Sequence, residues 1–479
     1  GGGARRPLAL DYREKAPLAA TSNMFLDENN NVDQQKIKFS HQAVGVPGTV
    51  AGLAMALETY GTISLERALK PAIELAENGM IVDEDLYNSL AFARKNLQKS
   101  SSSMAIFYKP DGSYYQIGEK LQQKDLANSL RLIAKQGAKA FYQGEIAAKI
   151  VADMAANNGL ITKEDLRKYQ PIIREPIKGN YRGYQIYSMP PPSSGGVHLV
   201  QMLNILEKFP IQSLGHNTAS TIHLMVESMK FAYADRFKFM GDTDFVEVPI
   251  ARLISKKYAN QIREKINLKQ AIPGQNIMNS PTFQDNESRE TTHYSIMDSY
   301  GNAVSNTYTL NFSYGSGLTV PGTGILLNNQ MDDFTSKPGV PNAYQLIGGE
   351  NNSIAPEKRM LSSMTPTIVM KEGKPWLVTG SPGGSRIITT TLQIIMNIID
   401  HEMNIAEATN APRIHHQWFP DQIRLERGIN GDTINLLEDK GHKIKTSFAM
   451  GSTQSIMYDK GLFYGASDPR KPGALTLGY

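Results

Sequence analysis

The stretch Thr291–Asp298, Thr-Thr-His-Tyr-Ser-Ile-Met-Asp, constrains the fold of this chain more than any other. It follows residues 267–290, a turn-rich run that is poor in apolar residues and ends in a polar tract. From Thr291 onward, β-branched and aromatic residues predict a strand, then residues 299–302 predict a turn and residues 303–311 a second strand. The sequence therefore predicts a β-hairpin that opens with a threonine directly after a flexible linker.

A strand that opens with threonine behind a linker is what a self-cleaving precursor requires. Cleavage of the Glu290–Thr291 bond would give Thr291 a free α-amino group beside its own hydroxyl. A free α-amine has a pKa near ~8, so part of it is neutral at pH 7 and can act as the base that activates the hydroxyl. The alternative is a plain hairpin whose threonines serve β-propensity alone.

The register of the hairpin bears on this choice. A loop with an odd number of residues, such as residues 298–302, places Thr291 opposite Thr309, with Asn311 diagonally beside it on the same face. An even loop would place Leu310 there instead, because a one-residue slip exchanges the two faces of a strand. We predict the odd register, which gathers hydroxyl and amide groups around Thr291; the alternative is a polar face in solvent.

Composition excludes several classes of protein. The 479 residues include no cysteine, which rules out disulfides, thiolate metal sites and a cysteine nucleophile. The net charge of +4 is too small to indicate nucleic-acid binding, and no apolar run approaches the ~20 residues of a membrane span. Helix patterns cluster in residues 1–290 and strand patterns in residues 291–479, which favours a mixed α/β sandwich.

Two loops could supply binding groups. Residues 380–386, Gly-Ser-Pro-Gly-Gly-Ser-Arg, join a predicted strand to a predicted helix. Such glycines let backbone N–H groups point at an oxyanion or a phosphate, although the Lys-Ser/Thr ending of a P-loop is missing. Residues 328–334, Asn-Asn-Gln-Met-Asp-Asp-Phe, form either a solvated loop or a pocket in which Asp333 binds an ammonium group. The Pro-, Gly- and Asn-rich residues 335–352 suit a lid.

Other polar residues have less specific patterns. Arg13 and the pair Ser362-Ser363 could hold a carboxylate through a guanidinium and two hydroxyls, but each alone fits an ordinary surface position. His415 and His416 are adjacent on a predicted strand, so they face opposite ways, and no carboxylate spacing supports a metal site. We expect a structural histidine pair and no metal.

Together these motifs closely resemble those of the γ-glutamyltranspeptidases, which are N-terminal-nucleophile hydrolases. The resemblance covers nearly the whole chain, in order: Asp11-Tyr12-Arg13-Glu14, Pro47 to Gly52, Met189 to Gly196, Thr291 to Ser295, Leu327 to Phe334, Leu361 to Met364, Gly380 to Arg386 and Gly451-Ser452-Thr453-Gln454. It implies an α+β fold, the four-layer αββα sandwich, made as one precursor. Residues 1–290 would become the large subunit and residues 291–479 the small subunit of one αββα domain.

The resemblance also implies roles for individual residues. Thr291 would be the nucleophile, both for cleavage of the Glu290–Thr291 bond and for turnover, with Thr309 hydrogen-bonding at its side. The other groups would bind the γ-glutamyl donor: Arg13, Ser362 and Ser363 its α-carboxylate, Asn311, Gln330 and Asp333 its α-amino group, Gly383 and Gly384 the oxyanion, with Tyr344 in the lid.

The implied reaction starts with attack of Thr291 on the γ-amide of glutathione or a related γ-glutamyl compound. The γ-glutamyl ester then passes to water or to an acceptor amino acid or dipeptide. The resemblance implies that no cofactor is needed. It also implies a periplasmic or secreted location, although this chain has no signal peptide. Family members usually carry several tens of residues before the match to Gly1-Gly2-Gly3, so we expect N-terminal truncation; Met360 also replaces the proline of many members.

Two other functions stay open. A cephalosporin acylase-like amidase is the nearest rival, but those relatives tend to alter the acid that binds the ammonium group, whereas Asp333 is kept. A catalytically silent, uncleaved binding protein is the other.

Overall fold

The main sheet contains strands from both ends of the chain. The computed structural model describes residues 6–278 and 291–479, so Glu290 of the expected cleavage site lies outside the described residues. The strand order is β17-β16-β12-β11-β6-β5, all antiparallel. The strands are β5 (Ile177–Tyr181), β6 (Tyr184–Ser188), β11 (Thr367–Lys371), β12 (Lys374–Thr379), β16 (Gln454–Asp459) and β17 (Leu462–Ser467). Because β6 pairs with β11, the two expected subunits share this sheet.

The predicted hairpin, β7 (Thr292–Met297) and β8 (Ala303–Tyr308), stacks on one face of this sheet. Strand β7 lies over β16 and β12, and β8 over β12 and β11. Ser295 Oγ donates to the carbonyl of Gln454 (2.7 Å), and Ser305 Oγ to that of Thr379 (2.9 Å). The odd-numbered residues of the hairpin therefore face the sheet.

Strand β8 ends at Tyr308, whereas residues 303–311 were expected to be extended. The expectation is wrong at its end because Asn311 adopts φ +77°, a left-handed conformation that leaves the sheet. The turn this creates brings Asn311 back towards the expected site.

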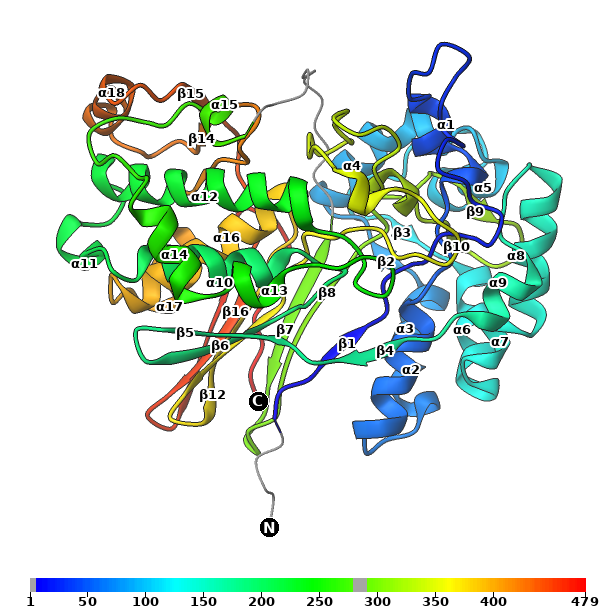
Figure 1. Ribbon diagram of the computed structural model, residues 1–479. Coiled ribbons are helices and arrows are strands. Elements are labelled where there is room, and N and C mark those ends of the chain that lie inside the picture. Colours follow the sequence, from blue (N-terminus) through cyan, green and yellow to red (C-terminus); the bar gives the residue numbers. More distant parts are fainter. Residues whose placement is uncertain (1–5, 279–290) are drawn as a thin grey trace.

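Helices α10 (Gly195–Leu206), α12 (Ala219–Phe239) and α16 (Ile387–Ile399) cover the opposite face of the sheet (Figure 1). The sequence of residues 218–239 predicts a long amphipathic helix, but the residues of α12 from Thr221 to Arg236 are all buried. Neighbouring helices and the loops after the sheet enclose it on every side, so charged residues of α12 are buried with the apolar ones. Shorter helices in this part are α11 (Ile211–Leu214), α13 (Ile250–Leu253), α14 (Lys256–Arg263), α15 (Gly274–Ile277), α17 (Ile405–Asn410) and α18 (Gly431–Asp439).

A second group of helices lies on the other side of the molecule, beyond the hairpin (Figure 1). It contains α1 (Gln34–Phe39), α2 (Thr49–Tyr60), α3 (Leu65–Asn78), α4 (Glu84–Leu97), α5 (Ser101–Phe107), α6 (Lys124–Gln136), α7 (Lys139–Tyr142), α8 (Glu145–Ala156) and α9 (Lys163–Lys168). Around a separate apolar cluster, α6, α7 and α8 pack against strands β9 (Thr319–Val320) and β10 (Ile325–Leu326). The sequence of layers is thus helices, sheet, hairpin sheet and helices.

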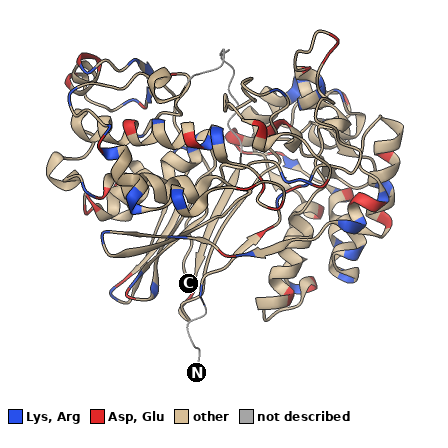
Figure 2. Cartoon of the chain, in the orientation of Figure 1, with Lys and Arg blue, Asp and Glu red and all other residues tan. Residues whose placement is uncertain are grey.

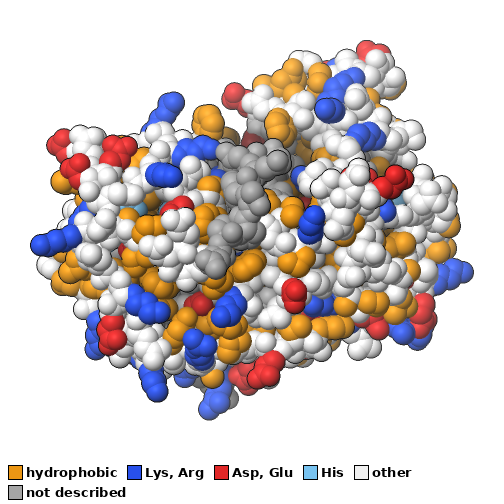
Figure 3. Space-filling view, turned by 45° about the horizontal axis from the view of Figure 1, so that its top comes forward, with side chains coloured by type: hydrophobic (Ala, Val, Ile, Leu, Met, Phe, Trp, Pro, Cys, Tyr) orange, Lys and Arg blue, Asp and Glu red, His pale blue; other side chains and the backbone are white. Residues whose placement is uncertain are grey.

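Small sheets connect these layers. They are β1 (Ala9–Asp11) with β4 (Ile172–Arg174), β2 (Met80–Ile81) with β3 (Lys120–Leu121), β9 (Thr319–Val320) with β10 (Ile325–Leu326), and β13 (Ile414–His415), β14 (Ile423–Leu425) and β15 (Ile444–Thr446) together. Charged residues lie mainly on the outer helices and loops (Figure 2), and on the face in Figure 3 hydrophobic side chains are interspersed with charged ones. Within residues 6–278 and 291–479, no helix has both the length and the hydropathy of a membrane span.

Candidate active site

Thr291 lies directly across the hairpin from Thr309. Thr292 pairs with Tyr308, so the next position along brings Thr291 and Thr309 opposite each other. Thr291 Oγ1 donates to Thr309 Oγ1 over 3.3 Å. The odd register predicted from the sequence is confirmed, and both hydroxyls lie on the face of the hairpin that points to the main sheet.

Asn311 joins this pair to the lid. Its backbone N–H donates to Thr309 Oγ1 (2.9 Å), and its side-chain Nδ2 donates to the carbonyl of Asn329 (3.0 Å). The hydroxyl of Tyr344, in the expected lid segment, donates to the carbonyl of Asn311. The left-handed turn at Asn311 therefore brings the Thr309 hydroxyl, the Asn311 amide and the Tyr344 ring together.

Arg13 and Asp333 form a buried ion pair. Arg13 Nη2 lies 2.5 Å from Asp333 Oδ2, and Arg13 Nη1 donates to Gln330 Oε1 over 2.9 Å. Gln330 Nε2 donates in turn to the carbonyl of Thr309 (3.0 Å). A continuous path of polar contacts thus joins Asp333 through Arg13 and Gln330 to the threonine pair, although Arg13 is separated from Asp333 by most of the chain.

The serine pair borders this ion pair. Arg13 Nε donates to the carbonyl of Met360 (3.2 Å), immediately before the segment that contains Ser362 and Ser363. Ser362 Oγ accepts from the N–H of Met364 (3.0 Å), and the carbonyl of Ser362 accepts from the N–H of Ser194 (2.9 Å). The structure therefore brings Arg13, Ser362 and Ser363 into one neighbourhood.

The glycine loop lies between β12 and α16, as predicted, and meets the lid at Gly384. Gly383 and Gly384 both adopt positive φ, +133° and +55°. A methyl group on Gly384 would lie 2.2 Å from Cδ1 of Tyr344, so only glycine lets the Tyr344 ring approach the loop this closely.

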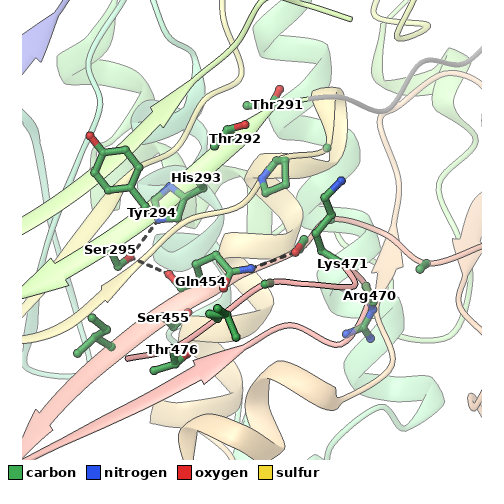
Figure 4. Close-up of a pocket in the computed structure, with 18 of the residues that line it drawn as sticks. Thr291, Thr292, His293, Tyr294, Ser295, Gln454, Ser455, Arg470, Lys471 and Thr476 are labelled. Carbon is green, nitrogen blue, oxygen red and sulfur yellow. Dashed lines mark hydrogen bonds between the residues drawn. The ribbon is translucent and has the colours of Figure 1, made fainter. Parts of the chain in front are cut away.

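A cavity of about 520 Å³ opens beside Thr291 (Figure 4). The hairpin, the glycine loop and the C-terminal segment line it, with Thr291, His293, Gly383, Gln454 and Lys471 among its residues. Lys471 Nζ pairs with Asp85 Oδ2 (2.8 Å), which ties the C-terminal segment to helix α4. Thr291 is thus accessible from this space. The residues expected to bind the donor head group, Arg13, Asn311, Gln330, Asp333, Ser362 and Ser363, do not line it.

A model of the gamma-glutamyltranspeptidase family matches residues 3–477. The chain belongs to the γ-glutamyltranspeptidase family. It is 53% identical to the glutathione hydrolase proenzyme of Escherichia coli (strain K12) over 473 residues, which are 98% of this chain and 81% of that relative. This is an enzyme family, and the word proenzyme agrees with the precursor expected from the sequence.

Solved structures place this γ-glutamyltranspeptidase family member among the N-terminal-nucleophile hydrolases. The cephalosporin acylase of Bacillus halodurans has a TM-score of 0.84 at 28% identity, over 97% of this chain and 83% of that one. The γ-glutamyltranspeptidase of Helicobacter pylori has a TM-score of 0.55 at 48% identity, over 56% of this chain and 76% of that one. The predicted αββα fold is confirmed.

Burial shifts the pKa of several groups in this family member's site. It raises the pKa of Asp333, against the opposing effect of the Arg13 guanidinium. It raises the pKa of Glu14 to about 7, although Arg13 lies 3.7 Å away and opposes the rise. Burial also lowers the pKa of His293 to about 3, so that ring is neutral at pH 7 beside the hairpin's threonines.

Sequence reasoning missed two buried charged residues near the expected γ-glutamyl site. Arg236 on α12 donates to Ser363 Oγ (3.3 Å), and Asp332 Oδ2 accepts from the N–H of Ala343 in the lid segment (3.2 Å). Burial raises the pKa of Asp332 to about 7. No pattern in the sequence distinguishes Arg236 from the other charged residues of α12, Glu227 and Lys230 among them. Asp332 had no signal beyond its neighbour Asp333.

The histidines have protein partners. His415 bonds Thr389 Oγ1 and Gln417 Oε1 (both 2.8 Å), while His416 contacts Asp421 (3.2 Å). A different trio, His223, Glu227 and His442, brings ligand atoms within 4.8 Å of one another. Its groups are already matched, because the two rings bond each other (2.8 Å) and Glu227 pairs with Lys230 (2.5 Å).

Proposed function

We propose that this chain is a γ-glutamyltranspeptidase that cleaves itself before Thr291 and then uses Thr291 as its nucleophile. The observation that carries the proposal is the position of Thr291 at the head of β7, hydrogen-bonded to Thr309 and accessible from the cavity. The buried Arg13–Asp333 pair supports a zwitterionic head group, because a molecule that carries a carboxylate and an ammonium group can bind both partners at once.

In the proposed acylation step, the Thr291 hydroxyl attacks the γ-carbonyl carbon of the donor. Its proton passes to the free α-amine of Thr291 and then to the leaving amine, as the C–N bond breaks and a C–O ester bond forms. Backbone N–H groups at Gly383 and Gly384 stabilise the oxyanion of the tetrahedral intermediate. Thr309 orients the nucleophile through its hydroxyl.

In the binding mode that we propose, Arg13 and the hydroxyls of Ser362 and Ser363 hold the α-carboxylate of the donor. Asp333, Gln330 and Asn311 hold its α-amino group. Tyr344 closes the site from the lid. Water, or the amine of an acceptor amino acid or dipeptide, then attacks the ester and regenerates Thr291.

The donor is glutathione or a related γ-glutamyl amide, as the name of the Escherichia coli relative suggests. The likeness to a cephalosporin acylase favours one rival, an amidase for donors that lack the amino group. We infer a periplasmic or secreted location and two subunits, residues 1–290 and 291–479, from the family resemblance.

The test compares hydrolysis of γ-glutamyl-p-nitroanilide with that of glutaryl-p-nitroanilide, which has the carboxylate but no ammonium group. Because Asp333 is present, we expect kcat/KM to favour the γ-glutamyl compound by roughly 100-fold, the contribution of a charge-assisted hydrogen bond. Preference for the glutaryl compound would select the acylase, and hydrolysis of neither would select the silent binding protein.

A further inference from the structure

Arg236 is a buried guanidinium that bonds to two hydroxyls. It lies near the end of α12 and is 5% exposed. Its Nε donates to Ser194 Oγ (3.0 Å) and its Nη2 to Ser363 Oγ (3.3 Å). Among residues 6–278 and 291–479, no carboxylate oxygen lies within 4.0 Å of this guanidinium. A buried charge bonded only to neutral hydroxyls is costly, so such a residue calls for a reason.

Two charged groups of the proposed donor site act on the Arg236 guanidinium. They are the carboxylate of Asp333 and the guanidinium of Arg13, which already form an ion pair with each other. Burial lowers the pKa of Arg236 to about 10, so it is still protonated at pH 7. Arg13 is paired with Asp333 and also lies 3.7 Å from the Glu14 carboxylate. Arg236 bonds to two neutral hydroxyls instead, so its charge is the one that a bound carboxylate would balance.

The hydrogen bonds of Arg236 also determine where the serine protons point. A hydroxyl has one O–H to donate, and a guanidinium can only donate. Ser194 Oγ accepts from Arg236 and donates to the carbonyl of Ser362 (2.8 Å). Ser363 Oγ likewise accepts from Arg236, so its own O–H is directed away from α12 and is available to a ligand.

Helix α12 holds Arg236 in a fixed relation to the glycine loop. One turn before Arg236, the hydroxyl of Tyr233 donates to the carbonyl of Ser385, directly after Gly384. A fully buried helix thus contacts both the loop proposed for the oxyanion and the serine proposed for the carboxylate. Both contacts come from one turn of a buried helix, so α12 holds Ser363 and the glycine loop in a fixed relation to each other.

We propose that Arg236 is a positioning residue for the α-carboxylate of the donor. Arg236 donates to Ser363 Oγ from the helix side, so that the Ser363 hydroxyl can donate to the carboxylate. It also supplies a positive charge, whereas the charge of Arg13 is already paired with Asp333. This inference rests on the proposed function, since it requires a donor with an α-carboxylate.

The test uses Arg236→Gln and Arg236→Lys with two donors in the cleaved protein. γ-Glutamyl-p-nitroanilide carries the carboxylate, and 4-aminobutyryl-p-nitroanilide is the same molecule without it. We expect KM for the γ-glutamyl donor to rise roughly 10- to 100-fold in Arg236→Gln, the effect of losing a charge-assisted hydrogen bond, with kcat changed by less than about 3-fold. The kcat/KM of Arg236→Gln for the 4-aminobutyryl donor should stay within about 2-fold of the value for the unaltered protein. The KM of Arg236→Lys for the γ-glutamyl donor should lie between those of the unaltered protein and Arg236→Gln.

Arg263→Gln is the control, because Arg263, at the end of α14, donates to the carbonyl of Asn204 on α10 and contacts none of the residues proposed to bind the donor. Its KM should match that of the unaltered protein. An unchanged KM in Arg236→Gln, or equal losses with both donors, overturns the inference and leaves the proposed function standing. If the unaltered protein hydrolyses neither donor, the proposed function itself fails.

A second variant covers the case in which neither Arg236 variant gives cleaved, folded protein. Ser194→Ala removes one of the two anchors of the guanidinium and leaves its charge. We expect KM for the γ-glutamyl donor to rise by roughly 5-fold, the effect of one neutral hydrogen bond, with no change for the 4-aminobutyryl donor. Equal KM values for Ser194→Ala and the unaltered protein would overturn the inference.

Discussion

Arg13 and Asp333 are each other's closest charged partners, with Arg13 Nη2 2.5 Å from Asp333 Oδ2. We propose that these residues bind opposite ends of the same head group. A zwitterion that enters the site must therefore exchange partners with this ion pair: its carboxylate takes the place of Asp333 on Arg13, and its ammonium group takes the place of Arg13 on Asp333. One buried ion pair is thus exchanged for two, which offsets part of the desolvation cost of binding.

Replacing Asp333 tests this exchange. In Asp333→Ala the ammonium group and Arg13 both lose a buried partner, so we expect weaker donor binding and a loss of stability, each of roughly 3–5 kcal/mol. Steady-state kinetics with γ-glutamyl-p-nitroanilide and a thermal melt measure the two effects. Asp333→Asn keeps the shape of the side chain and should lose less stability, but KM should still rise strongly. An unchanged KM in Asp333→Ala would exclude the assigned role.

Replacing Thr309 tests the orientation of the nucleophile. Thr309→Val keeps the shape of the side chain but removes the hydroxyl that accepts from Thr291. We expect kcat to fall by roughly 10-fold, with KM unchanged, because the nucleophile loses one hydrogen bond. Thr309→Ser restores the hydroxyl and should recover most of the rate. Equal kcat values in the valine and serine variants would count against this role.

Substitution of Gly384 tests the contact between the glycine loop and the lid. In Gly384→Ala the new methyl group overlaps the Tyr344 ring at 2.2 Å, so the lid must move and KM should rise at least several-fold. Gly373→Ala is the matched control. It also has positive φ, +79°, but no atom lies within 4 Å of the new methyl group. Both variants should lose roughly 1 kcal/mol of stability from backbone strain, and only Gly384→Ala should lose activity.

Glu14 makes stability depend on pH. Burial raises its pKa from 4.5 to about 7, so the folded state binds this proton more tightly than the unfolded state does. The stabilising contribution of the proton is fully present below pH 4.5 and disappears as the pH rises through 7. The total loss is roughly 3 kcal/mol, from 1.36 kcal/mol per pKa unit.

Glu14→Gln removes this titration. We expect its Tm, relative to that of the unaltered protein, to rise between about pH 5 and about pH 8.5, because only the unaltered protein must then bury a carboxylate. Thermal melts of both proteins across this range provide the measurement. A Tm difference that is the same at both ends of the range would contradict the assignment of the raised pKa to Glu14.

Local patterns predicted the centre of the candidate site. The alternation of a strand has a period of two residues, so an odd loop after Thr291 was enough to predict Thr309 opposite it, and the structure confirms this register. The strand–glycine loop–helix order around Gly383 also depends on neighbouring residues only. These features follow from backbone geometry within one continuous segment, since Thr291 and Thr309 are only 18 residues apart.

Contacts between distant segments could not be predicted in the same way. Nothing near Arg13 in the sequence indicates that its guanidinium pairs with Asp333, because their approach depends on how β1 and the loop at 328–334 pack. Residues 218–239 were expected to form an amphipathic helix, but neighbouring elements bury residues 221–236, Arg236 included. Whether a charged residue is buried depends on how the layers pack together. The spacing of apolar residues along one helix does not predict it.

The central claim is that Thr291 becomes a chain terminus and then acts as the nucleophile. Intact mass and N-terminal sequencing of the purified protein, alongside turnover of γ-glutamyl-p-nitroanilide, test it most directly. We predict two chains, the second beginning at Thr291, and a single uncleaved chain without activity in Thr291→Ala. An unaltered protein that hydrolyses the donor while its chain stays uncut before Thr291 would contradict the account.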